Sequence, residues 1–268
     1  MKIAVVCPIG PLNRYGYEHV ATDCIASMVD FADHVFLMQS ARDKAGVEAV
    51  LRANGGRVTL VSDERTWFNG ERFDAQKVMD NADLGADLAL AEGYDVAICL
   101  MVNWYVPPKN RRGLRLACER AVETGWAWLY RRDQLGLQMF HVNTRLPWII
   151  ALRPGRPHYG IDSIHWQDGT SLDWGRGAWP EYDEQSVIDL QLEMTRADMQ
   201  ERLEYVRFHK DLLPKRPTHF EWDYWKRYYV EKYHKKTLAT DKPTGAGIVV
   251  AGQSARFVSS EILEALHG

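Results

Sequence analysis

Apolar runs alternate with amphipathic stretches over roughly the first 105 residues of the chain. The apolar runs predict strands at residues 2–7, 34–38, 58–61 and 96–102, and the amphipathic stretches predict helices at about residues 17–31, 48–54 and 74–91. Strands that lack a polar alternate position are typical of a parallel sheet buried on both faces. The pattern therefore predicts an α/β chain with a mostly parallel central sheet flanked by helices.

The crossover rule for such sheets places the functional loops at the carboxyl ends of the strands. In this chain those ends are residues 8–15, 40–43, 62–67 and 101–105. We expect a binding site at this edge of the sheet.

The pattern changes after residue 105. A helix at residues 110–123 and strands at residues 126–130, 137–142 and 148–152 predict an α+β continuation of the same sheet, and loops rich in Gly, Trp and Asp follow. Residues 184–212 have the pattern of a charged amphipathic helix. The Gly-rich run Pro243–Gly247 reads as a linker turn, before a strand at 247–251 and a helix at 259–266. We predict one part over residues 1–180, which holds the sheet and the sites. A mainly helical extension over residues 181–268 packs on it.

Composition narrows the class of protein. The 268 residues are 46% hydrophobic, which is ample for a large core, and the net charge of -3 argues against a basic coat for nucleic acid over the whole chain. The four cysteines form no CxxC pair, so we expect neither a structural zinc site nor a disulfide framework, and we expect a cytoplasmic protein. No apolar run reaches the roughly 18 residues that a transmembrane helix needs.

Three common motifs are absent from the sequence. The first strand is followed by neither GxGxxG nor GxxxxGK[ST], so a dinucleotide-binding Rossmann site and a P-loop are not supported. GxSxG is also absent, which weakens a hydrolase interpretation.

The order of the segments resembles the start of a GT-A fold glycosyltransferase of the family-2 kind. The first strand ends in Cys7-Pro8-Ile9-Gly10, and the second ends in Met38-Gln39-Ser40-Ala41-Arg42-Asp43. Residues 73–85 and 95–108 are similar to the family's next segments, the second of which carries an Asp-x-Asp motif and is followed by Pro. The resemblance covers about residues 1–110. It implies a GT-A-like, Rossmann-like sheet and the transfer of a sugar from a nucleoside-diphosphate-sugar donor to an acceptor hydroxyl.

The sequence departs from the family where the Asp-x-Asp motif is expected, because it has Met101-Val102-Asn103 there. The family uses the two carboxylates to hold Mg²⁺ or Mn²⁺ on the donor's diphosphate. One alternative is a divalent cation held by Asn103 with other groups, such as His165 or His158. The other is that Arg and Lys meet the charge of the diphosphate, as guanidinium groups do well.

The resemblance implies a donor site at the tips of the strands. Its expected residues are Pro8, Ile9, Arg14, Ser40, Arg42, Asp43, Asp63, Lys77, Asn81, Met101 and Asn103. Asp43 or Asp63 would accept hydrogen bonds from the base or ribose; the alternative is that both are turn or helix-cap residues. Lys77 and Asn81 lie four apart on one helical face, which is either part of the site or a solvated surface.

An inverting transferase needs a carboxylate that deprotonates the acceptor hydroxyl. The candidates are Asp133, Asp162 and Asp168, and the alternative is a hydrogen-bonded loop without chemistry. Ten tryptophans are an unusually large share, and aromatic rings stack on sugars as well as filling cores. We expect Trp104, Trp166, Trp174 and Trp179 to contact the acceptor, and we interpret the excess, Trp67 included, as facing ligands rather than the core.

The acceptor depends on residues 205–242, where basic and aromatic side chains are interleaved. This segment is a helix packed on the sheet, a face for nucleic acid or another anionic polymer, or a helix at a membrane surface. The acceptor is accordingly a glycan or a hydroxylated base in DNA. A chain without Asp-x-Asp also fits a non-catalytic module that binds nucleotides or glycans.

Overall fold

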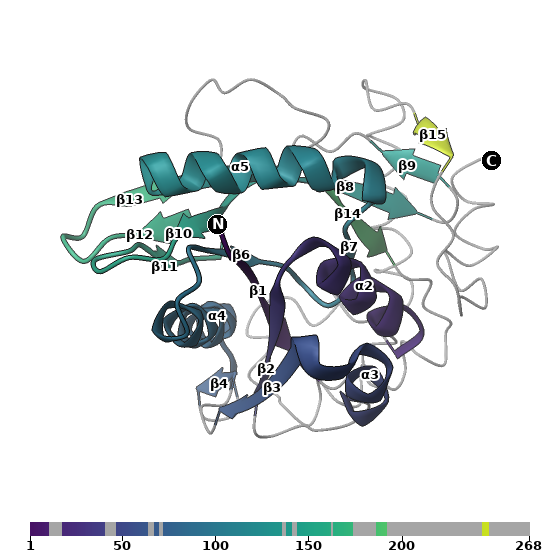
Figure 1. Cartoon of the computed structure of the whole chain (residues 1–268), viewed down its shortest axis with the longest axis horizontal. Helices are drawn as coiled ribbons and strands as arrows, with labels where there is room; N and C mark the ends of the chain where they lie inside the picture. Colours follow the sequence, from purple (N-terminus) through teal and green to yellow (C-terminus); the bar gives the residue numbers. More distant parts are fainter. Residues whose placement is uncertain are drawn as a thin grey trace.

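The computed structural model describes residues 1–10, 18–40, 47–63, 67–69, 72–135, 138–140, 144–161, 163–173, 186–191 and 243–246 (Figure 1). Within these residues, a curved sheet lies between helices, and a small three-stranded sheet stands beside it.

The central sheet is mixed. Its strands, in spatial order, are β15 (Pro243–Ala246), β9 (Gln138–Phe140), β8 (Trp126–Leu135), β10 (Thr144–Ala151), β6 (Val96–Cys99), β1 (Ile3–Ile9), β2 (His34–Ser40) and β3 (Val58–Asp63). The four strands β6, β1, β2 and β3 run parallel, whereas β10 runs antiparallel to both of its neighbours. The expectation of a mostly parallel sheet is therefore not confirmed. A strand buried on both faces has the same apolar pattern in either direction, so the pattern carries no direction.

Two further strands complete one side of this sheet. β14 (Ser186–Gln191) pairs in parallel with β8 and antiparallel with the short β7 (Trp104–Tyr105). Two short strands, β4 (Phe68–Asn69) and β5 (Arg72–Phe73), form a separate ribbon after β3.

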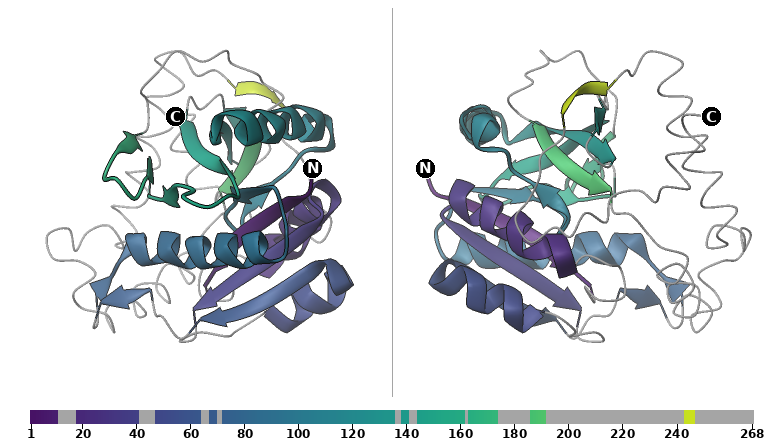
Figure 2. Two further views of the ribbon diagram at one scale, coloured as in Figure 1. Left: turned by 60° about the vertical axis from the view of Figure 1, so that its left-hand side comes forward. Right: turned by 90° about the vertical axis from the view of Figure 1, so that its right-hand side faces the viewer.

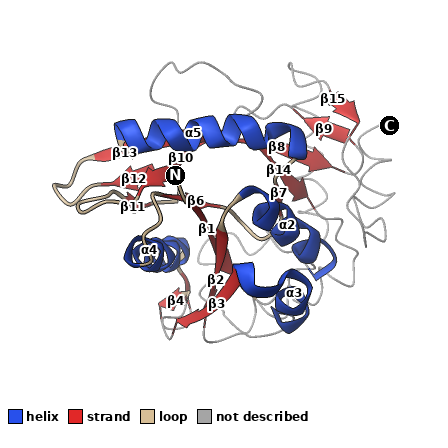
Figure 3. Ribbon diagram, viewed as in Figure 1, coloured by secondary structure: helices blue, strands red, loops and turns tan. Residues whose placement is uncertain are grey.

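Helices cover both faces of the parallel strands. They are α2 (Glu18–Phe31), α3 (Val47–Asn54), α4 (Ala75–Ala91) and α5 (Arg111–Thr124), with the 3-10 turns η1 (Gly55–Arg57) and η2 (Pro108–Asn110). The turned views show α4 on one side of β1 and β2, and α2 and α3 on the other (Figure 2). α5 lies over β8 and β10 (Figure 3). It also contacts the end of α2, where Arg115 donates to the carbonyl of Phe31. None of the described helices combines the length and the apolar character needed to cross a bilayer.

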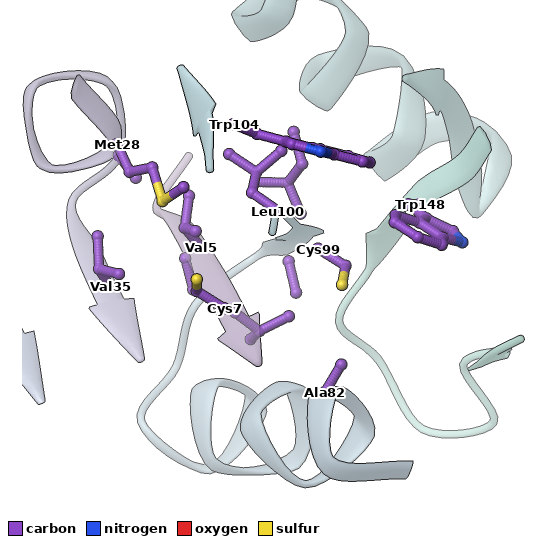
Figure 4. Close-up of a cluster of buried hydrophobic side chains, with 14 of the residues drawn as sticks. Val5, Cys7, Met28, Val35, Ala82, Cys99, Leu100, Trp104 and Trp148 are labelled. Carbon is purple, nitrogen blue, oxygen red and sulfur yellow. The ribbon is translucent and has the colours of Figure 1, made fainter. Parts of the chain in front are cut away.

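The core lies between these layers because the sheet strands have no polar face. All seven residues of β1 are buried, and Figure 4 shows its side chains Val5 and Cys7 packed with others from β2, β6, α2 and α4. Leu100 and Trp104 continue the core beyond the end of β6, where the Trp104 ring stacks on Trp148 at a centroid distance of 5.5 Å.

The small sheet consists of β11 (His158–Tyr159), β12 (Ser163–His165) and β13 (Ser171–Asp173), all antiparallel. A buried arginine joins it to α4. Arg156 donates to the Asp83 carboxylate at 2.8 Å and to that of Asp87 at 2.6 Å, and the Asp83 carboxylate also accepts from the backbone N–H of Tyr159.

Two predictions for the last third of the chain are wrong. Residues 184–212 do not begin as a helix, because Ser186–Gln191 is strand β14. Pro243–Ala246 is not a linker turn, because it forms β15 and pairs with β9. The rest of the predicted extension lies outside the described residues, as does the basic aromatic segment 205–242. The division into parts 1–180 and 181–268 stays a prediction, although β14 and β15 belong to the same sheet as β1.

Candidate functional site

The candidate site lies at the carboxyl edge of the parallel strands. β1 is the switch point of the sheet, since β2 follows it on one side and β6 lies on the other, and the connecting helices α2 and α4 pack on opposite faces. Open α/β sheets bind their ligands in the crevice outside such a point. Pro8 and Ile9 at the end of β1 are buried, as is Gly10 after them.

Buried polar side chains gather at the ends of β2 and β3. Ser40 and Asp63 are the last residues of these strands and are paired in register. Asn81, on α4, donates from Nδ2 to Asp63 Oδ2 at 3.2 Å. We call Ser40, Asp63 and Asn81 the strand-tip cluster; their exposed fractions are 3%, 9% and 1%. The cluster brings together three residues that the sequence predicts for the donor.

Polar atoms of this region are buried without a partner among the described residues. They are Ser40 Oγ, Asn81 Oδ1 and the Nε1 of Trp67, which follows β3 at the same edge. A buried polar atom without a hydrogen bond costs about 1–3 kcal/mol, so such atoms are uncommon away from ligand sites. These three atoms offer a hydroxyl, an amide carbonyl and an indole N–H to a ligand.

A second polar group lies where the turn after β6 meets β14. Asn103 donates from Nδ2 to Asp189 Oδ1 at 2.7 Å, and Asp189 Oδ2 lies 3.6 Å from Arg131 Nε on β8. The guanidinium of Arg131 lies 5.7 Å from the centroid of the Trp104 ring. We call Asn103, Asp189 and Arg131 the Asn103 network. It joins three segments at the carboxyl edge, and two of its members, Asp189 and Arg131, are not expected from the sequence.

The rings of the two tryptophans at the strand tips are buried. Trp104 is 3% exposed and is held between Trp148 and Arg131, and Trp67 is 9% exposed. Both rings are thus buried, whereas the interpretation of the tryptophan excess places them on a ligand-facing surface. Trp104 is buried because the apolar turn after β6 folds back and extends the core. Contact of Trp104 with the acceptor stays a prediction. Trp166 is half-buried and packs against the core. Trp174 and Trp179 lie outside the described residues.

The candidate bases occupy different places. Asp168 is exposed in the turn between β12 and β13, where Thr170 donates to it through its backbone N–H at 2.9 Å and its hydroxyl at 2.7 Å. These hydrogen bonds lower the pKa of the Asp168 carboxyl. Because β12 is antiparallel to both neighbours, this turn lies at the opposite end of β12 from Gly160 and Ile161. Asp168 therefore has the geometry of a turn-capping residue.

Gly160 lies beside the stacked tryptophans. Trp148 Nε1 donates to the carbonyl of Gly160 at 3.1 Å, and Trp148 stacks on Trp104. Asp162 itself lies outside the described residues, and Asp133 is described only as a position in β8, paired with Asp189. Both stay predictions as the catalytic base.

The residues expected to bind a metal have other partners. His165 Nε2 lies 2.7 Å from Ser163 Oγ, and Asn103 turns its N–H rather than its carbonyl toward Asp189. Within the described ranges, no three His, Cys, Asp or Glu side chains gather closely enough to hold a metal ion. Around Asn103, the Asp189 carboxylate faces an amide N–H and a guanidinium, so its oxygens are turned to donors of the protein itself.

Only some of the other residues predicted for the donor site lie in the described part of the chain. Lys77, on α4, and Met101, two residues after the end of β6, are half-buried. Arg14, Arg42 and Asp43 lie outside the described residues and stay predictions.

Comparisons with known proteins give weak similarities only. No protein-family model matches the chain, and no curated protein sequence does. Among the solved structures similar to it, residues 1–349 of S. aureus TarS in complex with UDP-GlcNAc are 10% identical, with 90% of this chain and 76% of that chain covered and a TM-score of 0.42. The 4-diphosphocytidyl-2C-methyl-D-erythritol synthase of Anaerococcus prevotii is 12% identical, with coverage of 99% and 95% and a TM-score of 0.35. Mannose-1-phosphate geranyltransferase from Thermus thermophilus is 15% identical, with coverage of 96% and 73% and a TM-score of 0.32. Values this low leave the function to be inferred from the chain's own residues.

Proposed function

We propose that the chain is a glycosyltransferase that moves a sugar from a nucleoside-diphosphate-sugar donor to an acceptor hydroxyl. The observation that carries the proposal is the strand-tip cluster. Its buried atoms Ser40 Oγ and Asn81 Oδ1 have no partner among the described residues, and they lie at the switch-point edge of the sheet. A base or ribose has donors and acceptors that would satisfy them, and it would repay the cost of their burial.

The proposed reaction needs a leaving group and a base. The acceptor oxygen forms a bond to the anomeric carbon of the sugar, the bond from that carbon to the diphosphate oxygen breaks, and a carboxylate takes the hydroxyl proton. We assign the base to Asp162 rather than Asp168, since Gly160 contacts Trp148 and the Asp168 turn lies at the other end of β12. The departing nucleoside diphosphate keeps the electron pair and needs cations around it.

Binding of the donor is the first test. The full chain is mixed with UDP-, GDP- and CDP-sugars, with and without Mn²⁺, and its melting temperature is followed. We expect at least one sugar nucleotide to raise the melting temperature with increasing concentration, because a ligand that binds only the folded state stabilises it. The Asn81→Ala variant should lose this shift. Asn54→Ala, which removes an amide from the end of α3, is the control and should keep it.

The outcomes separate the candidate functions. If no sugar nucleotide shifts the melting temperature of the unaltered chain, the proposal fails. A shift without hydrolysis or transfer of the donor would instead indicate a non-catalytic nucleotide-binding module. Loss of turnover, with retained binding, in Asp162→Ala would support the assignment of the base.

A further inference from the structure

We infer that Arg131 binds the diphosphate of the donor and that Asp189 is the positioning residue that holds it there. The inference rests on the proposed function and deepens it, since it names the group that meets the charge of the leaving diphosphate. Neither residue belongs to the segments on which the resemblance to glycosyltransferases rests.

Arg131 is fixed on two sides at the carboxyl edge. Its Nε lies 3.6 Å from Asp189 Oδ2, and its guanidinium carbon lies 5.7 Å from the centroid of the buried Trp104 ring. Ion pairing and the ring face both favour one orientation of the guanidinium. The Arg131 side chain is nevertheless 25% exposed, against 7% for Asp189, so part of it still reaches the surface.

Asp189 connects Arg131 to the turn that carries Asn103. The Asp189 carboxylate accepts from Asn103 Nδ2 through one oxygen and faces Arg131 with the other. The carboxylate therefore sets the position of both a neutral amide and a cation. In the resemblance, the diphosphate lies at the turn of residues 101–103, next to which Arg131 is held.

Stability alone does not explain this network. Taking two charges out of water costs several kcal/mol, and apolar residues of similar volume often serve a fold as well or better. The buried Arg156, which pairs with two carboxylates, joins two elements of the structure. Arg131 instead pairs with Asp189 and has a partly exposed side chain at the edge where the ligand is expected.

The experiment separates recognition of the base from recognition of the diphosphate. Isothermal titration calorimetry measures the affinity of the full chain for UDP, GDP and CDP and for the matching nucleosides, in EDTA and again with Mn²⁺. For whichever nucleotide binds, Arg131→Gln should weaken the diphosphate by about tenfold or more and change the affinity of the nucleoside little. The affinity in EDTA should remain close to that with Mn²⁺.

Two further variants separate the role of Arg131 in binding from other effects of its substitution. Arg131→Gln alone leaves the Asp189 charge buried without its ion pair, so the double variant Arg131→Gln/Asp189→Asn removes both charges and should show the same loss. Arg145→Gln is the control, because Arg145 also lies over an aromatic ring, that of Tyr130. Arg145 is paired with Tyr130, the residue before Arg131, so it lies on the opposite face of the sheet.

The results distinguish the two proposals. If the unaltered chain binds none of the nucleotides or nucleosides, the proposed function fails. If it binds the nucleoside diphosphate and the double variant binds it equally well, the inference about Arg131 is overturned while the proposed function stands. Equal losses in Arg131→Gln and Arg145→Gln would also overturn it, since they would reflect general charge rather than position.

Discussion

Trp104 links the core to the candidate site. Its ring stacks on that of Trp148, with the centroids 5.5 Å apart and an interplanar angle of 16°. The guanidinium of Arg131 lies 5.7 Å from the centroid of the Trp104 ring. The ring thus supports the turn that presents Asn103 as well as filling space. We therefore expect substitution of Trp104 to lower the stability of the fold, and to weaken ligand binding because the turn loses its support.

Trp104→Leu should lower the free energy of unfolding by about 3 kcal/mol, because it leaves a cavity and removes the stacking partner of Trp148. Trp104→Phe keeps an aromatic face and should cost about half as much. Urea unfolding followed by circular dichroism measures both. Trp126→Leu, at a half-buried position, is the comparison and should cost less. A Trp104→Leu chain as stable as the unaltered one would mean that the ring is not part of the core.

Gly85 allows α4 to approach the sheet closely. A Cβ at this position would lie 2.9 Å from Met38 Sδ and 3.0 Å from Val6 Cγ1. Both neighbours are fully buried and have little room to move.

Gly85→Ala should therefore destabilise the chain by about 1–2 kcal/mol, since overpacking outweighs the better helix propensity of Ala. Gly56→Ala is the control, because a Cβ there meets no atom within 4 Å, and it should change stability little. The free energy of unfolding in urea measures the difference. A gain in stability for Gly85→Ala would show that the helix propensity outweighs the close contact.

At the scale of elements, the junction between α4 and the small sheet depends on one buried side chain. Arg156 is 4% exposed and donates to Asp83, Asp87 and two backbone carbonyls. The planar fork of a guanidinium suits this set of acceptors, and a lysine ammonium does not.

Arg156→Lys should cost about 2–3 kcal/mol, because it keeps the charge but leaves buried acceptors without donors. Hydrogen exchange should show the amides of β11 and β12 losing protection before those of β1 and β2. Arg153→Lys, on the exposed turn just before, is the control and should leave exchange unchanged. Equal loss of protection throughout the sheet would mean that the junction does not open separately.

The elements differ in how well the sequence predicts them. The strands β1, β2 and β6 and the helices α2, α4 and α5 were predictable, because long apolar or amphipathic runs leave few alternatives. Strand β14 was missed, since Val187 and Ile188 are followed by a charged stretch whose spacing fits a helix. Only the partners of β14 in the sheet decide its conformation, and these are far away in the sequence.

The same limit applies to the site. Ser40, Asp63 and Asn81 were predictable because they end strands or lie on the helix that follows, and parallel strands end at one edge. The Asn103–Asp189 hydrogen bond joins residues 86 apart, and no local pattern predicts it. The burial of Trp104 was likewise beyond local reasoning, since it depends on how a turn packs against β10.

At the scale of the whole molecule, the four cysteines lie in the strands and in the helices that pack on them. Cys7 lies on β1, Cys24 on α2, Cys99 on β6 and Cys118 on α5, and all four are fully buried. Burial raises the pKa of the Cys7 and Cys118 thiols to about 12, because a thiolate is poorly solvated in the core. Burial is also the largest cause of the raised pKa values of the Cys24 and Cys99 thiols.

These shifts predict a loss of stability at high pH. The unfolded chain releases its thiol protons near the ordinary value of about 8.5, whereas the folded chain keeps them. Between about pH 9 and 12 the unfolded state therefore binds fewer protons, and each thiol lowers the free energy of unfolding by about 1.4 kcal/mol per pH unit. In Cys118→Ala the decline measured by urea unfolding between pH 8 and 10 should be smaller by about 1–2 kcal/mol. Ile150→Val, which removes a buried methyl group but no titrating group, should keep the full decline. If Cys118→Ala and the unaltered chain declined equally, the Cys118 thiol would not titrate differently in the folded and unfolded states.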